Sequence, residues 1–149
     1  MPAAGGERKL HVYLYLVTPN AALRNADLPT RDSDGRLTRR PRAALDLHYL
    51  ISFYGDERLL EPDRMLGAVA RDLHARPVLD ARLIQDAIDS NADLAGSDLA
   101  SSLELVKLSV SQLSLEELSR LWSVLVQTPH ALSIACVGTV VLIDAVESG

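Results

Sequence analysis

Four histidines and one cysteine are the side chains of this 149-residue sequence best suited to chemistry. His48 lies two residues from Asp46, so both side chains point to the same face of a predicted strand. A carboxylate beside an imidazole is an arrangement that can move protons. The other three histidines stand alone, without H-E-x-x-H or a comparable metal-ligand spacing. Cys136 lies inside an apolar run with no neighbouring base, which is typical of a small buried hydrophobe.

The acidic residues and the glycines form no further candidate catalytic or binding site. Asp86, Asp89 and Asp93 have helical spacing, which is more typical of a solvated helix face than of a cation site. The eight glycines form no phosphate-binding loop. The sequence therefore predicts no catalytic residue, no metal and no cofactor. A small α/β enzyme that uses His48 and Asp46 stays open as the alternative.

The composition excludes several classes of protein. A hydrophobic fraction of 48% with 23% charged residues is ordinary for one globular domain. The net charge of −5 argues against a general nucleic-acid binder. No apolar run approaches the roughly 20 residues of a membrane helix, and the N-terminus lacks the apolar centre of a signal peptide. We expect a protein that assembles in the cytoplasm and contacts no membrane.

The positive charge is concentrated in one segment, residues 18–42, which we call the arm. Six arginines and three aspartates give the arm a net charge of +3, whereas the rest of the chain carries −8. A basic segment on an acidic body suits a contact between like copies, although a solvated loop can also collect charge. The arm lacks the interleaved aromatic residues that stack on nucleic-acid bases.

Two predicted strands flank the arm. Residues 10–17 alternate with a period of two and are apolar on both faces, so we expect this strand to be covered on both sides. The second strand is Ala43–Tyr54. An arm of this length exceeds the usual connection within a domain, and such loops are commonly functional. Asp34-Gly35 is a turn signal, and we interpret the arm as a loop that becomes ordered on a partner.

The remainder alternates helices and strands. Glu61-Pro62 opens one helix, and Asp80 caps a second. Ser114 and Glu117 form a capping box at the start of a third. Further predicted segments are a surface loop over Asn91–Ser102, a strand near a sheet edge over Leu103–Val110, and a central strand, apolar on both faces, over Ala131–Asp144.

This order, β-arm-β-α-α-β-α-β, predicts an α/β (α+β-like) fold in one domain, residues 1–149. We expect a single mixed β-sheet of about four strands with three helices. The third and fourth strands, joined by one helix, are the expected parallel pair.

Four runs of the sequence resemble a known family. They are LYLVTPNAALRNAD (14–27), RAALDLHYLISFYG (42–55), LEPDRMLGAVARDLHARPV (60–78) and LSLEELSRLWSVLVQTP (113–129). In combination they are similar to the cap, or tail-terminator, proteins of phage-tail-like contractile injection systems, whose N-terminal domain was long catalogued as a domain of unknown function. The resemblance covers residues 12–143.

The resemblance implies a structural protein with a tail-terminator-like fold and no catalysis. Such caps form a six-fold ring on the baseplate-distal end of the inner tube, stop tube growth, and join the last sheath layer to the tube. The implied partners are further copies of the chain, expected as a hexamer, together with the inner tube protein and the sheath protein. A monomeric cargo-binding module stays open as a third reading. We expect the contacts in the arm, at Arg24, Asn25, Arg31, Arg36, Arg39, Arg40 and Arg42.

Overall fold

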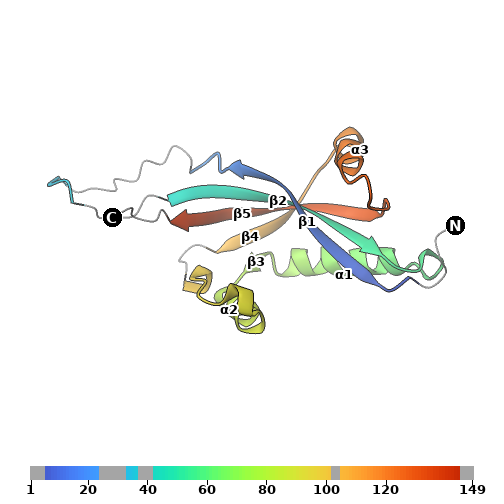
Figure 1. The fold of residues 1–149 in the computed structure, drawn as a ribbon, viewed down its shortest axis with the longest axis horizontal. Helices are drawn as coiled ribbons and strands as arrows, with labels where there is room; N and C mark the ends of the chain where they lie inside the picture. Colours follow the sequence, from blue (N-terminus) through green and yellow to red (C-terminus); the bar gives the residue numbers. More distant parts are fainter. Residues whose placement is uncertain (1–5, 24–32, 37–41, 102–104, 145–149) are drawn as a thin grey trace. The chain divides into compact units, whose positions relative to one another are not determined.

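The structure, a computed structural model, describes residues 6–23, 33–36, 42–101 and 105–144 (Figure 1). Its strands are β1 (Lys9–Pro19), β2 (Arg42–Tyr54), β3 (Val78–Leu79), β4 (Val106–Ser111) and β5 (Leu132–Asp144). Its α-helices are α1 (Glu61–Ala75), α2 (Ala81–Ser90) and α3 (Leu115–Val124). Three short 3-10 helices are η1 (Glu57–Leu59), η2 (Ala92–Leu94) and η3 (Leu99–Ser101).

The five strands form one antiparallel sheet in the order β1-β2-β5-β4-β3. β5 occupies the centre, as its two apolar faces predicted. The class is confirmed, but the sheet has one strand more than expected, because β3 contains only two residues. The expected parallel pair is wrong. β4 and β5 are neighbours but run antiparallel, since the chain reverses direction through α3.

The chain divides into two compact units, each built from three segments. The first contains Met1–Tyr15, His48–Pro77 and Leu108–Val137. Its core consists of the buried residues Ile51, Phe53 and Cys136, against which the α1 residues Met65, Leu66 and Val69 pack. These α1 positions recur at helical spacing, so one face of the helix covers one face of the sheet.

α3 covers the opposite face of the sheet in the first unit. Residues next to each other in a strand point to opposite faces, and Leu118 of α3 lies beside Leu50 rather than Ile51. The predicted capping box starts this helix: the Glu117 backbone N–H donates to Ser114 Oγ at 3.1 Å, and the Ser114 N–H donates to Glu117 Oε2 at 2.7 Å.

The second unit contains Leu16–Leu47, Val78–Lys107 and Gly138–Gly149. β3 pairs antiparallel with β4, with Val78 opposite Lys107. Asp80 caps α2 by accepting a 2.8 Å hydrogen bond from the Leu83 N–H. Of the α2 side chains, Ile84 is buried, whereas Leu83 is 46% exposed. Of these two residues, only Ile84 is fully covered by the described residues.

β1 is the clearest difference from the sequence prediction. It is an edge strand, and only Tyr15 and Thr18 of its eleven residues are partly buried. The expectation that β1 is covered on both sides is therefore wrong for the single chain. Within the described residues, no helix combines the length and apolarity that crossing a bilayer requires.

Candidate functional site

The base of the arm is organised around one side chain, Asn20. Its backbone N–H donates to the Ala44 carbonyl oxygen of β2 at 2.9 Å. Its side-chain oxygen accepts from the N–H groups of Ala22 and Leu23 at 3.1 and 3.0 Å. Its amide nitrogen donates to Asp46 Oδ1 at 2.8 Å. Asn20 therefore fixes both the turn that follows β1 and the attachment of that turn to β2.

The described parts of the arm beyond this turn are residues 33–36 and Arg42, where β2 begins. Gly35 has φ of +76°, a conformation that favours glycine, and the predicted turn at Asp34-Gly35 is present. Arg36 and Arg42 are both exposed, and both take part in contacts. The remaining predicted contact residues, Arg24, Asn25, Arg31, Arg39 and Arg40, lie outside the described residues.

The acid–base candidates Asp46 and His48 have different neighbours. Asp46 accepts the hydrogen bond from Asn20. The His48 ring lies beside the Tyr15 ring, with centroids 6.2 Å apart. Neither residue lines the cavity described below. Asp46 thus attaches the start of the arm to β2, whereas the neighbour of His48 is the ring of Tyr15.

Two more histidines also contact aromatic rings. His11 of β1 lies 5.0 Å from the ring of Tyr54, and His130 lies 4.9 Å from that of Trp122. Burial raises the pKa of Tyr15, and the nearby negative charge of Glu117 raises it further. The Tyr54 hydroxyl donates to the Pro129 carbonyl oxygen at 3.0 Å. These contacts link β1, β2 and the segment after α3 within the first unit.

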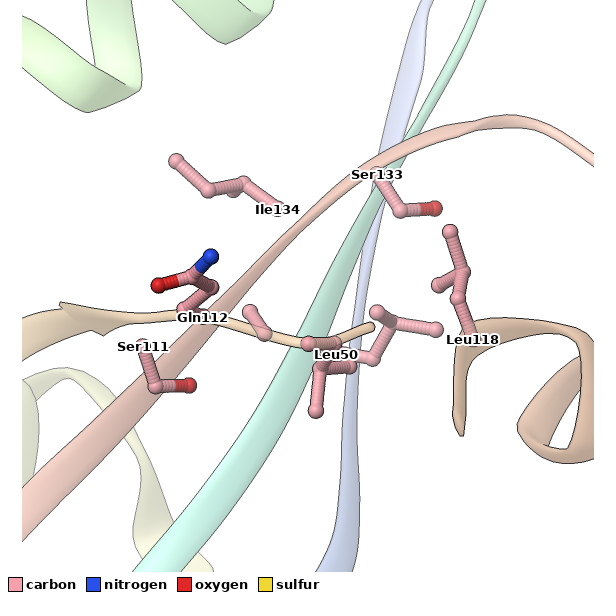
Figure 2. Close-up of a pocket in the computed structure, with 8 residues that line it drawn as sticks. Leu50, Ser111, Gln112, Leu118, Ser133 and Ile134 are labelled. Carbon is pink, nitrogen blue, oxygen red and sulfur yellow. The ribbon is translucent and has the colours of Figure 1, made fainter. Parts of the chain in front are cut away.

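A cavity of about 260 Å³ lies between α3 and the sheet in the first unit (Figure 2). Figure 2 shows Leu118 approaching from α3, opposite Leu50 of β2. The lining residues are Leu50, Ser111, Gln112, Leu113, Leu118, Ser133, Ile134 and Ala135. None of them ionises near neutral pH, so the lining offers an apolar site with hydroxyl and amide groups and no general base.

The serine hydroxyls around this cavity differ in their hydrogen bonding. Ser133 donates to the Ala131 carbonyl oxygen at 2.9 Å. The 3.0 Å contact between the hydroxyls of Ser52 and Ser133 therefore has Ser52 as its donor. Ser111 Oγ is buried and has no hydrogen-bond partner among the described residues. Ser52 and Ser133 join β2 to β5, whereas Ser111 is the group that an incoming polar atom could satisfy.

Cys136 and the aspartates of α2 were assigned structural roles from the sequence. Cys136 is 2% exposed, and burial raises the pKa of its thiol, so the reactive thiolate is disfavoured. Asp89 accepts a 2.8 Å hydrogen bond from Gln85 one helical turn earlier. Among the described residues, no three carboxylate, imidazole or thiol groups are grouped as metal ligands would be.

Two structural features were missed by the sequence reasoning. Asn20 is paired with Asp46, which lies 26 residues away, and no local pattern indicates this pairing. The exposed apolar side chains of β1 were read as core, because a strand that is apolar on both faces looks the same whether its own chain or another chain covers it.

Residues 1–149 match the family model described as the Pvc16 N-terminal domain. A search of the curated proteins found no match.

Proposed function

Because the chain belongs to the Pvc16 N-terminal domain family, which is related to contractile injection systems, we propose that it is the cap of such a particle. Copies of the chain form a ring on the baseplate-distal end of the inner tube. The ring ends tube growth and joins the tube to the sheath. The family match over the whole chain is the observation that carries this proposal.

The distribution of apolar side chains supports a subunit that other chains cover. Among the described residues, eight apolar side chains are buried, counting that of Pro62, whereas twenty large ones are exposed. Several of these protrude strongly, including Leu115 (83%) and Val126 (84%) of the α3 region. Exposed apolar surface on this scale favours an assembled protein over a free monomer.

The arm is our candidate for the contact with neighbouring copies, the tube or the sheath. Its net charge of +3 opposes the −8 of the rest of the chain, and opposite charges favour docking in a defined orientation. Asn20 and Asp46 hold the start of the arm against β2. The contact residues proposed within it are Arg24, Asn25, Arg31, Arg36, Arg39, Arg40 and Arg42.

Charge reversal in the arm tests this proposal. The variant Arg36→Glu/Arg39→Glu/Arg40→Glu is expected to fold normally, since Arg36 is exposed and no described residue of the arm is among the buried core residues. It should fail to form rings or to limit tube length. Electron microscopy of tube subunits assembled with the purified protein gives tube length and shows the presence of a cap.

A matched control reverses the same amount of charge elsewhere. Arg64, Arg71 and Arg82 are exposed residues of α1 and α2, and changing all three to Glu gives the same net charge as the arm variant. This control is expected to cap tubes. Capped tubes of normal length with the arm variant would remove the arm from the contact, and overlong tubes with the wild-type protein would contradict the cap function.

A further inference from the structure

β1 has the properties of an edge strand that can pair with a strand of another chain. It is the edge strand of the sheet and runs for eleven residues, about twice the usual strand length. Its alternate residues Leu10, Val12, Leu14 and Leu16 are 41%, 59%, 44% and 47% exposed. On its other face, Tyr13 and Val17 are exposed as well.

Soluble proteins normally protect such edges from pairing with other chains. The usual devices are charged residues or proline within the strand, a short edge strand, or cover by another element. In β1 the charged Lys9 and the proline Pro19 occur only at the two ends. The nine residues between them carry no lysine, arginine, aspartate or glutamate.

We propose that β1 pairs antiparallel with β1 of a second copy of this chain, with the two-fold axis at Leu14. Leu14 is the middle residue of Lys9–Pro19, so centring the pair there uses the whole edge. Val12 then lies opposite Leu16 of the second copy, and Tyr13 lies opposite Tyr15. Residues directly opposite share a face, so the aliphatic residues of both strands form one continuous stripe.

The charges at the ends of β1 fit this arrangement. Lys9 lies opposite Pro19 of the second copy, so no like charges face each other. The next residue, Arg8, lies 3.6 Å from Glu61 of its own chain with its side chain 70% exposed. In the pair it lies opposite Asn20 of the second copy, whose side chain is bonded to the Asp46 carboxylate. The basic end of each strand therefore meets an acidic group of the other copy. Two-fold symmetry makes this attraction occur twice.

This contact does not depend on the cap function. A two-fold contact joins two copies and is then closed, whereas a ring needs contacts that repeat head to tail. We therefore expect the β1 pair to form in the free protein in solution. An extended strand of an unrelated protein is the competing occupant, and the experiment below separates the two.

Cysteine cross-linking tests the arrangement directly. In Leu14→Cys the two new thiols lie opposite each other across the two-fold axis, at a spacing that a disulfide bridges. Under mild oxidation with oxidised glutathione, this variant is expected to become a covalent dimer. Leu115→Cys is the matched control, since Leu115 is 83% exposed on α3, and it should remain largely monomeric on a non-reducing gel. Cys136 is buried and contributes little in either case.

A second variant measures association without a covalent bond. Val12→Lys places a charge in the middle of the paired edge and should halve the mass measured by light scattering, with an unchanged circular dichroism spectrum. Leu115→Lys should remain dimeric. A wild-type protein that is monomeric at high micromolar concentration would overturn the proposal and favour an unrelated strand as occupant. Equal cross-linking of Leu14→Cys and Leu115→Cys, or a dimer that survives Val12→Lys, would also overturn it.

Discussion

Gly55 occupies a position where a single methyl group has no room. A Cβ there would lie 2.9 Å from both Cβ and Oε2 of Glu61. Glu61 Oε2 accepts a 2.8 Å hydrogen bond from the Asp56 N–H, and its other oxygen lies 3.6 Å from Arg8 Nε. Gly55→Ala should therefore displace Glu61 and lower the free energy of unfolding by about 1–3 kcal/mol, the usual cost of overpacking.

Gly67 gives the matched control for this substitution. It lies inside α1, and a Cβ there would meet nothing within 4 Å. Gly67→Ala should raise the free energy of unfolding by up to about 1 kcal/mol, because alanine is the better helix former. Urea denaturation of both variants checks the pair. Equal effects at the two positions would contradict the close packing at Gly55.

The Ser114–Glu117 capping box predicts a pH dependence at the residue scale. Hydrogen bonds from the Ser114 backbone and side chain lower the pKa of Glu117. A carboxyl whose pKa is lower in the folded state stabilises the fold above its unfolded pKa, and this contribution is lost as pH falls through the folded pKa. Glu117→Ala should therefore lower the melting temperature by a few degrees at pH 7 and by much less in strong acid.

Glu116 provides the control for that measurement. It lies in the same helical turn and pairs with Arg120, and both side chains are more than two-thirds exposed. Exposed ion pairs contribute little, so Glu116→Ala should change the melting temperature less than Glu117→Ala at pH 7. The reverse order, or an effect of Glu117→Ala that does not decrease in acid, would show that the capping box is not the stabilising contact.

At the scale of elements, the arm depends on the Asn20–Asp46 hydrogen bond. Asn20→Asp keeps the acceptor for the turn but removes the donor and places a second negative charge against Asp46. We expect a loss of roughly 1–2 kcal/mol in the free energy of unfolding. Adding Asp46→Asn should restore most of it, because donor and acceptor are then exchanged. A double variant no more stable than Asn20→Asp would contradict this pairing.

The elements with local signals were predicted well from the sequence. The capping box placed the start of α3, Asp80 placed that of α2, and the two apolar faces of β5 placed it at the sheet centre. β3 was missed because two residues show no periodicity. The direction of β4 relative to β5 was wrong because the presence of a connecting helix does not decide whether the strands it joins are parallel.

At the scale of the whole molecule, burial was the property that the sequence could not give. Residue type does not distinguish a residue in the core of one chain from a residue at an interface between chains. β1 was therefore predicted to be covered by its own chain, although Val12 is 59% exposed. The contact role of the arm arginines stays a prediction from residue type and segment, and two of the seven proposed contact residues, Arg36 and Arg42, are described and exposed. The pairing of Asn20 with Asp46 required the fold.

The partly buried Ser52–Ser133 contact helps to set the register of the neighbouring strands β2 and β5. β2 and β5 are apolar on both faces near this contact, so hydrophobicity alone would tolerate a slip of one residue, which turns every side chain to the opposite face. A slipped register would separate the two hydroxyls and leave Ser52, which is 5% exposed, without its acceptor. An unpaired buried hydroxyl costs about 1–3 kcal/mol. The hydrogen bond between these two serines thus favours the observed register of β2 and β5 over a register shifted by one residue.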